Sequence, residues 1–393
     1  MKYQRTHRLA IPIMTALVVG GYGVAFSDER QQPLTKLDQQ IDQHAQRTVA
    51  EGRQIFRYDT FGDEAFWGDT IKLHQAIQGT RFGGIGPGVS PQTALSVGLK
   101  VDVDALPNEL IESLKKGRVD LTDPATTLAL LKLNAVIGVT GFFKPTGTLR
   151  SIGIQCALCH TAVDDALAPG IGHRLDGWAN RDLNVGAIIN LAPDLSAVAT
   201  LLGVDEPTVR KVVTAWGPGK FDAELLLDGK GFRPDGKSAA TLIPPAFGLA
   251  GVNLHTWTGW GSVPHWNGFV ANLEMQGKGT FYDPRLNDPV QFPVAARAGS
   301  GNVRSDPDLV SAKLPALHFY QLAIPAPRPP QGSFDHNASL AASKCSRTRH
   351  AAPPAMFRRL TPSRDGTCIP RKRSVSTISK PIALRISATV PHR

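Results

Sequence analysis

The stretch Cys156-Ala157-Leu158-Cys159-His160 has the pattern C-x-x-C-H, which is the attachment sequence of c-type haem. Two thiols one helical turn apart can both add to the vinyl groups on one edge of a porphyrin. The histidine that follows then lies beneath the iron as its proximal ligand. The sequence therefore predicts one covalently bound haem c on Cys156 and Cys159, with His160 bound to the metal.

Three other interpretations of this motif are a zinc half-site, a redox dithiol and a structural disulfide. A structural zinc site needs a second pair of ligands, and the sequence contains no other C-x-x-C. A redox dithiol would tolerate His160 but would not need it. The cysteines number four in 393 residues, too few for a disulfide scaffold; they are Cys156, Cys159, Cys345 and Cys368. Haem attachment is the preferred interpretation.

Residues 1–27 have the pattern of a secretory signal peptide. A basic start precedes the uncharged, mostly apolar run 9–26, and Ala25 and Ser27 are the small residues expected before cleavage at about Asp28. The alternative is an uncleaved anchor, but the run is short for a span and contains proline and glycine. No later stretch approaches 18 uninterrupted apolar residues. We therefore expect a periplasmic protein with no transmembrane span in the mature chain.

The charge is concentrated at one end of the chain. The formal net charge is +10, yet residues 341–393 hold 12 Lys or Arg and one acidic residue, which leaves 31 basic and 32 acidic residues elsewhere. The body of the chain therefore implies no nucleic-acid partner. With 42% hydrophobic and 19% charged residues, the composition also excludes a polytopic membrane protein, a coiled coil and a wholly disordered chain.

Local patterns predict a mainly α fold, a cytochrome c-like haem domain with long loops followed by a disrupted second cytochrome c domain. The predicted helices cover residues 34–77, 110–116, 125–137, 187–202, 207–215 and 310–322. Between them, the glycine-rich segment 80–91 and the segment 217–245 are predicted loops, and 324–332 is a proline-rich linker.

Two stretches resemble the bacterial di-haem cytochrome c peroxidases. Residues 170–184 (GIGHRLDGWANRDLN) resemble the segment with the distal haem ligand, and His173 occupies the matching histidine. Trp266, Asn267 and Gly268, followed by Leu273, Glu274 and Gln276, resemble the family's W-D/N-G-R-x-x-x-L-x-x-Q signature beside the peroxidatic haem. The likeness covers about residues 145–345. It implies that His173 is a second iron ligand and that Glu274 and Gln276 are catalytic, moving a proton between the two peroxide oxygens.

The sequence departs from that family in three places. Phe269 stands where the family usually has Arg, and a segment between about Asp194 and Thr241 is inserted. Cys345 falls where the second C-x-x-C-H should begin, but the next cysteine is Cys368. We therefore expect one haem here and a second one in intact relatives.

These observations divide the chain into a signal peptide (1–27), a haem-binding domain (28–332) and a remnant of a second haem domain (333–393) that we expect to be disordered. Its basic composition would also suit an arm that binds a membrane or a polyanion. A third interpretation is a shifted reading frame, because the composition of the chain changes abruptly where this segment begins.

The predicted function is that of an exported electron-transfer cytochrome that takes electrons from a small redox protein or a quinol-linked donor and reduces hydrogen peroxide. The alternative is a non-enzymatic carrier whose six-coordinate iron lies between His160 and His173. Other candidates for the sixth ligand are His255, His265 and Met275, although a core position is the commoner role for such a methionine. The nearby Trp257, Trp260 and Trp266 are expected in the core, or on an electron path at the haem edge.

Overall fold

The computed structural model describes residues 35–256, 259–330, 332–350, 360–362 and 368–370. The predicted signal peptide therefore lies outside the described residues. The chain divides into a first unit, Met1–Pro325, and a second unit, Ala326–Arg393. The division falls inside the segment 324–332 that the sequence predicts as a linker.

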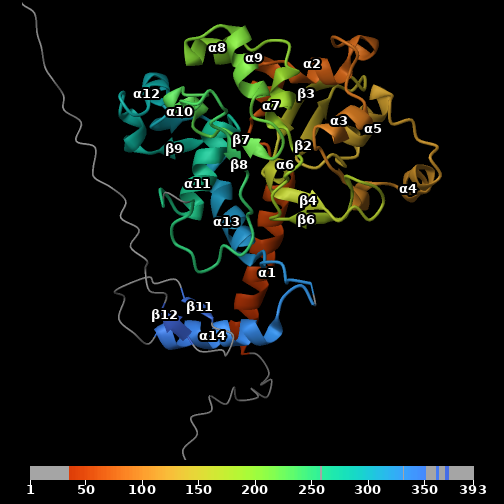
Figure 1. Cartoon of the computed structure of the whole chain (residues 1–393). Coiled ribbons are helices and arrows are strands. Elements are labelled where there is room, and N and C mark those ends of the chain that lie inside the picture. Colours follow the sequence, from red (N-terminus) through yellow and green to blue (C-terminus); the bar gives the residue numbers. More distant parts are fainter. Residues whose placement is uncertain (1–34, 257–258, 331, 351–359, 363–367, 371–393) are drawn as a thin grey trace, which may run out of the picture. The chain divides into compact units, whose positions relative to one another are not determined.

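Helices form most of the regular structure in the first unit (Figure 1). The α-helices are α1 (Lys36–Tyr58), α2 (Leu73–Gln78), α3 (Pro91–Ser96), α4 (Asn108–Lys115), α5 (Pro124–Lys132), α6 (Ala157–His160), α7 (Val185–Asn190), α8 (Ser196–Leu202), α9 (Glu206–Thr214), α10 (Leu225–Asp228), α11 (Val263–Phe269), α12 (Pro293–Ala298) and α13 (Leu314–Ala323). Two π-helical turns are η1 (Ala65–Thr70) and η4 (Val270–Glu274). The 3₁₀ turns are η2 (Thr80–Phe82), η3 (Val103–Ala105), η5 (Pro284–Asn287) and η6 (Ser311–Lys313).

Short strands pair into two-stranded sheets between these helices. The strands are β1 (Val101–Asp102), β2 (Val139–Phe143), β3 (Leu149–Ile154), β4 (Thr161–Val163), β5 (Ile171–Gly172), β6 (Arg174–Asp176), β7 (Lys220–Phe221), β8 (Thr241–Leu242), β9 (Thr280–Tyr282) and β10 (Asn302–Arg304). β1 pairs with β5 in parallel, whereas β2 with β3, β4 with β6, β7 with β8 and β9 with β10 are antiparallel. The architecture is therefore mixed, and the prediction of a mainly α fold holds only loosely.

The single helix predicted over 34–77 is wrong, because the helix is interrupted after Tyr58. α1 begins at Lys36, where Thr35 and Asp38 form a capping box. It ends where the Asp59 carboxylate accepts a hydrogen bond from the Phe61 amide at 2.8 Å and Phe61 takes a positive φ of 53°. After this break the chain forms η1 and α2. The apolar residues keep a helical spacing through the break, so the spacing alone does not reveal it.

Two further predicted helices are shorter than expected. The helix predicted over 187–202 is divided into α7 and α8 by a segment that contains Pro193, and Asp194 accepts a hydrogen bond from the Ser196 amide at 3.1 Å. The helix predicted over 125–137 ends at Lys132, and Asn134 follows with a φ of 52°. The predicted loop 217–245 contains β7, the short helix α10 and β8.

α1 and α13 lie side by side and pack closely (Figure 1). Gly52 allows this approach, since a Cβ at that position would lie 2.0 Å from the carbonyl oxygen of Ala316. The contact is reinforced by Asp176 of β6, which accepts hydrogen bonds from Arg57 at 2.6 Å and from Tyr320 at 2.5 Å. The first and last helices of the unit are thereby tied to β6, which pairs with β4, the strand directly after α6.

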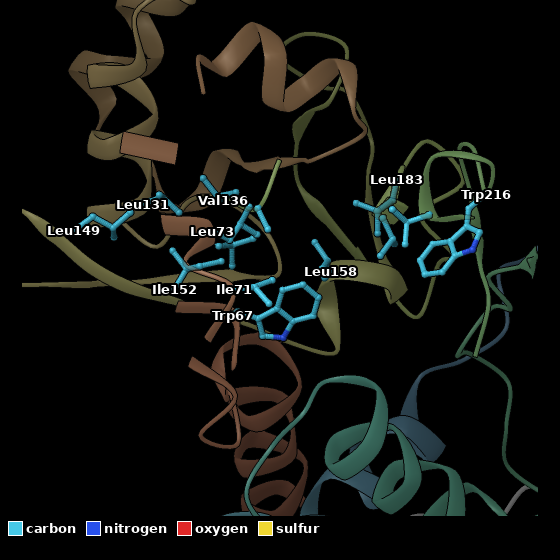
Figure 2. Close-up of a cluster of buried hydrophobic side chains, with 14 of the residues drawn as sticks. Trp67, Ile71, Leu73, Leu131, Val136, Leu149, Ile152, Leu158, Leu183 and Trp216 are labelled. Atoms are coloured by element: carbon cyan, nitrogen blue, oxygen red, sulfur yellow. The ribbon is translucent and has the colours of Figure 1, made fainter. Parts of the chain in front are cut away.

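The largest core cluster of the first unit brings together residues that are far apart in the sequence. Figure 2 shows Leu158, the second x of the C-x-x-C-H motif, with Trp67 and Ile71 on one side and Leu183 and Trp216 on the other. Leu158 is buried, as are all of these neighbours. The C-x-x-C-H motif is therefore anchored in the main core by one of its two variable positions.

The second unit contains α14 (His336–His350) and the antiparallel pair of β11 (Leu360–Pro362) and β12 (Cys368–Pro370). From the sequence we expect residues 333–393 to be disordered, whereas the structure has these elements within that segment. No helix within the described residues is long and apolar enough to cross a membrane.

Candidate functional site

The C-x-x-C-H motif lies directly after β3, where α6 forms a single helical turn. The amide of Gln155 donates to the carbonyl of Gly138 at 3.0 Å, which holds the end of β3 against β2. Gly138 has a φ of 82°, and a Cβ there would lie 2.2 Å from the Cα of Leu158. This close approach fixes the start of α6, so Cys156 and Cys159 are presented one helical turn apart.

Both cysteines and His160 line one cavity of about 1040 Å³. Its wall is mostly apolar, with side chains from elements far apart in the sequence, such as Trp67, Leu130, Ile152, Leu158, Val185 and Ile243. Pockets that enclose small molecules typically measure about 300–1,000 Å³. The cavity is therefore large enough, and apolar enough, for a flat macrocycle.

The His160 ring is held in one orientation by the backbone of Pro244. Its Nδ1 donates a hydrogen bond to the Pro244 carbonyl at 3.1 Å. Because a carbonyl only accepts, the proton of the neutral ring lies on Nδ1, which leaves the lone pair on Nε2 free to bind a metal. Burial lowers the pKa of His160 to about 4, so the ring is neutral at pH 7.

The two thiols are free and protonated. Burial raises the pKa of both Cys156 and Cys159 to about 12, and the charge of Glu274 adds to the effect on Cys159. Neither cysteine takes part in a disulfide. Both side chains remain partly accessible, but this surface faces the cavity. Such thiols have little thiolate character, unlike those of redox-active dithiols.

The structure brings one of the two predicted catalytic residues to the cavity. Glu274, at the end of η4, lines the wall, and its pKa is raised to about 8 by burial and by the negative charge of Asp222. Gln276 is not among the residues of the wall; it has a φ of 63° and donates from Nε2 to the carbonyl of Leu273 at 2.5 Å. Only Glu274 is thus placed to act on a molecule in the cavity.

His173 does not reach the cavity in the structure. It lies between β5 and β6, its side chain is 55% exposed, and its Nδ1 is 2.8 Å from the carboxylate of Asp104. Its amide donates to Asp164 at 2.8 Å. His173 therefore lies outside the wall of the cavity that His160 lines, and its role as a second iron ligand stays a prediction.

The other candidates for the sixth ligand have different surroundings. His255 lines the cavity. His265 lies outside the wall in an aromatic cluster with Trp266, Phe269 and Phe281, and its Nε2 is 3.7 Å from Asp283. Met275 also lines the cavity, but it is 4% exposed and belongs to a core cluster, which is the commoner role for a methionine.

The aromatic cluster explains why an arginine is missing after Gly268. Phe269 is buried, and its ring lies 5.3 Å from that of Trp266 and 5.8 Å from that of Phe281. A guanidinium at this position would be desolvated among aromatic rings. Trp260 and Trp266 both line the cavity, whereas Trp257 lies outside the described residues.

Nothing in the sequence singles out Asp222, which the structure places in the same cavity wall as Glu274. It follows β7 and is 5% exposed. Its Oδ1 accepts a hydrogen bond from the Glu224 amide at 3.2 Å, while its Oδ2 is sealed from solvent without a partner among the described residues. A single aspartate in a loop has no sequence signature, so only the fold reveals it.

Comparisons with protein-family models, with curated proteins and with solved structures found no match to this chain. Within the part of the chain that the structure describes, no three His, Cys, Asp or Glu side chains gather as they would around a bound metal ion. The side chains of Cys345 and Cys368 lie outside the described residues.

Proposed function

We propose that this chain is an exported c-type cytochrome that carries one haem c on Cys156 and Cys159, with His160 as the axial ligand. The observation that carries the proposal is the common position of these three side chains in the wall of one large apolar cavity. When bound, the haem supplies one-electron redox chemistry at its iron. The protein supplies the covalent attachment, the ligand and the apolar surroundings.

The details of His160 support this assignment. A metal-bound histidine usually donates its other ring N–H to a carboxylate or a backbone carbonyl, as His160 does to Pro244. Its lowered pKa keeps the ring neutral, which is the form that binds iron. The free, apolar thiols favour attachment over a dithiol function or a disulfide.

We further propose that the reaction is reduction of hydrogen peroxide with electrons from a small redox protein or a quinol-linked donor. The resemblance to the di-haem peroxidases motivates this, and the position of Glu274 in the cavity wall supports it. A carboxyl group there can exchange a proton with a peroxide oxygen. The C-x-x-C-H motif occurs once in the sequence, so the donor would act on this haem without a second covalent haem.

The alternative function is a non-enzymatic carrier with six-coordinate iron. It is favoured by the presence of His255 and Met275, two of the candidates for the sixth ligand, in the cavity wall. A spectrum distinguishes the two: a high-spin form that changes on addition of peroxide supports the enzyme, and a permanently low-spin form supports the carrier.

The test is to express the chain with its N-terminal segment in a host competent for haem attachment and to count haem per purified chain. We expect one haem that stays attached after denaturation, as measured by mass spectrometry. A variant with Cys156→Ala and Cys159→Ala should carry none, and a matched variant with Cys345→Ala and Cys368→Ala should still carry one. Two haems, or none in the unaltered chain, would overturn the proposal.

A further inference from the structure

The single haem motif leaves one electron of the proposed reaction without a source. Reduction of hydrogen peroxide to two water molecules takes up two electrons, whereas a haem iron exchanges electrons one at a time. The C-x-x-C-H motif occurs once, so no second covalent haem is available to hold the other electron. A side chain beside the motif that can lose one electron would fill this role.

Tyr320 of α13 has the surroundings of such a side chain. Its hydroxyl donates to Oδ2 of Asp176 at 2.5 Å, which is the length of a charge-assisted hydrogen bond. Tyr320 is 6% exposed, and so is the side chain of Asp176, which shields the bond from solvent. A tyrosine gives up its phenolic proton when it loses an electron, and a carboxylate at this distance can accept that proton.

This hydrogen-bonded pair adjoins the C-x-x-C-H motif. β6 pairs with β4 so that Asp176 lies opposite Thr161, the residue directly after His160. Thr161 Oγ1 donates to Oδ1 of Asp176 at 3.1 Å. Tyr320 belongs to the same core cluster as Ala157, the first variable residue of the motif. The pair therefore contacts the segment that would carry the haem.

We propose that Tyr320 supplies one of the two electrons for peroxide reduction and passes its phenolic proton to Asp176. This inference rests on the proposed function, since it names the side chain that holds the second electron of that reaction. Tyr320 is the redox-active residue of the pair, and Asp176 is its proton acceptor.

The reaction balances with groups already named. The O–O bond of hydrogen peroxide breaks and takes up two electrons, one from the haem iron and one from Tyr320. Solvent supplies two protons, and two water molecules form. Tyr320 becomes a neutral phenoxyl radical, and Asp176 becomes a neutral carboxylic acid. The redox donor then returns one electron to the iron and one to Tyr320, which regains its proton from Asp176.

The charges around the pair keep the tyrosine protonated at rest. Arg57 donates from Nε to the same Oδ2 of Asp176 at 2.6 Å, and the guanidinium carbon of Arg53 lies 5.8 Å from the centre of the Tyr320 ring. Burial, together with the negative charge of Asp176, raises the pKa of Tyr320 above its ordinary value. The phenol therefore keeps its proton until an electron leaves the ring.

Two tryptophans of the cavity wall are less suited to this role. Trp67 donates from Nε1 to the carbonyl of Met275 at 2.9 Å, and a carbonyl does not take up the proton of an oxidised indole. Trp260 donates to Asp283 at 3.1 Å, but the guanidinium carbon of Arg285 lies 4.5 Å from the centre of the Trp260 ring. A cation at this distance opposes the positive charge of an oxidised ring.

The first experiment adds hydrogen peroxide to the haem-loaded protein, freezes the mixture within milliseconds and records its electron paramagnetic resonance spectrum. We expect the signal of a tyrosyl radical, which growth on ring-deuterated tyrosine should narrow. Tyr320→Phe keeps the ring that packs against Phe56 but removes the hydroxyl, so it should lose the signal. Tyr58→Phe is the matched control and should keep the signal, because the Tyr58 ring faces a cation, the Arg174 guanidinium at 5.3 Å.

Two results of this experiment would overturn the inference. One is a radical signal that Tyr320→Phe leaves unchanged, and the other is peroxide reduction without any protein radical. If Tyr320→Phe does not fold, Asp176→Asn tests the same step. Asparagine can accept the hydrogen bond of Tyr320 but does not take up its proton, so the radical should not form.

A second readout needs no haem. In a variant with Tyr58→Phe and Tyr282→Phe, Tyr320 is the only tyrosine after the predicted signal peptide, so ultraviolet photolysis of the frozen protein forms the tyrosyl radical there. High-field spectra should show a narrow signal from a radical oxygen that accepts one hydrogen bond, because the proton moved to Asp176 still faces it. The matched variant that keeps only the exposed Tyr282 should give the broad signal of a radical surrounded by water.

This haem-free test separates the two proposals. A chain that binds no haem would defeat the proposed function and still allow the photolysis experiment. A radical on Tyr320 whose oxygen accepts no hydrogen bond would overturn the inference, with or without haem.

Discussion

Nδ1 of His160 donates a hydrogen bond of 3.1 Å to the carbonyl oxygen of Pro244, which lies 84 residues further along the chain. The contact joins the haem motif to the segment after β8. Because the acceptor is a backbone carbonyl, it fixes the tautomer of His160 without introducing a charge. The His160 ring, the proposed axial ligand, is thus oriented by a part of the chain outside the C-x-x-C-H motif.

The first prediction concerns the pH dependence of folding through His160. Its pKa is lowered by burial from 6.5 to about 4, so the unfolded chain binds more protons than the folded chain between these values. Its contribution to stability is therefore present above about pH 6.5 and is lost as the pH falls toward 4. In haem-free protein, the difference in free energy of unfolding between the unaltered chain and His160→Gln should shrink over this range.

Denaturant unfolding at several pH values measures this difference. His173→Gln is the control, because that side chain is largely exposed. If the difference for His160→Gln stays constant from pH 7 to about 4, the ring is not buried as the structure has it.

The second prediction concerns His173. In the structure its ring pairs with Asp104 at the surface and does not line the cavity. His173→Ala should therefore leave the absorption spectrum of the haem protein unchanged, whereas His255→Ala, in the cavity wall, should alter it if the iron has six ligands. A shift from low spin to high spin in His173→Ala would show that the β5–β6 loop moves onto the iron when haem binds, as the resemblance implies.

The local part of the site could be read from the sequence, and the non-local part could not. Cys156, Cys159 and His160 are adjacent, and their chemistry follows from spacing alone. Pro244 contacts His160 and Asp222 reaches the cavity wall only because of the fold, and nothing in their neighbourhood along the chain marks them. Glu274 was reached only through the resemblance.

In the fold, apolar periodicity predicts some of the helices and misses the break between two of them. The helix predicted over 207–215 matches α9 (Glu206–Thr214), because Pro207 and the following apolar period are local signals. The break after Tyr58 was missed, since it depends on the carboxylate of Asp59 and on a positive φ at Phe61, not on periodicity. A local turn of this kind interrupts the helix without interrupting the apolar periodicity.

The third prediction concerns Asp63, a fully buried carboxyl group near the haem motif. Burial is the main cause that raises its pKa to about 10, although it accepts hydrogen bonds from the Ile154 amide. The folded chain therefore holds a proton that the unfolded chain releases above pH 3.8, and stability declines as the pH rises from there toward 10. At pH 7 this linkage costs up to about 4 kcal/mol.

Asp63→Asn removes that cost and keeps an oxygen for Ile154. We expect the variant to be more stable than the unaltered protein at pH 7, by about 1–4 kcal/mol, and to have a weaker pH dependence. Denaturant unfolding at pH 5, 7 and 9 measures both. Asp69→Asn, at an exposed position on η1, should change stability by less than about 0.5 kcal/mol. A destabilised Asp63→Asn would mean that the carboxyl group is ionised in the fold.

The last prediction concerns the buried ion pair of Arg174 on β6 and Asp102 on β1, whose side chains are 3% and 5% exposed. Arg174 Nε donates to the Asp102 carboxylate, and the guanidinium carbon lies 5.3 Å from the centre of the Tyr58 ring, while Nη1 has no hydrogen-bond partner among the described residues. Asp102→Ala would leave this cation buried and uncompensated, and should destabilise the protein by about 3–5 kcal/mol.

The exposed pair of Lys115 and Glu112 is the matched control, and Glu112→Ala should cost less than about 1 kcal/mol. The double variant Asp102→Ala with Arg174→Met should recover part of the loss, because removing both charges avoids the unpaired one. Thermal unfolding of the unaltered protein and the three variants measures these differences, and equal costs for Asp102→Ala and Glu112→Ala would show that the β1–β6 pair is open to solvent.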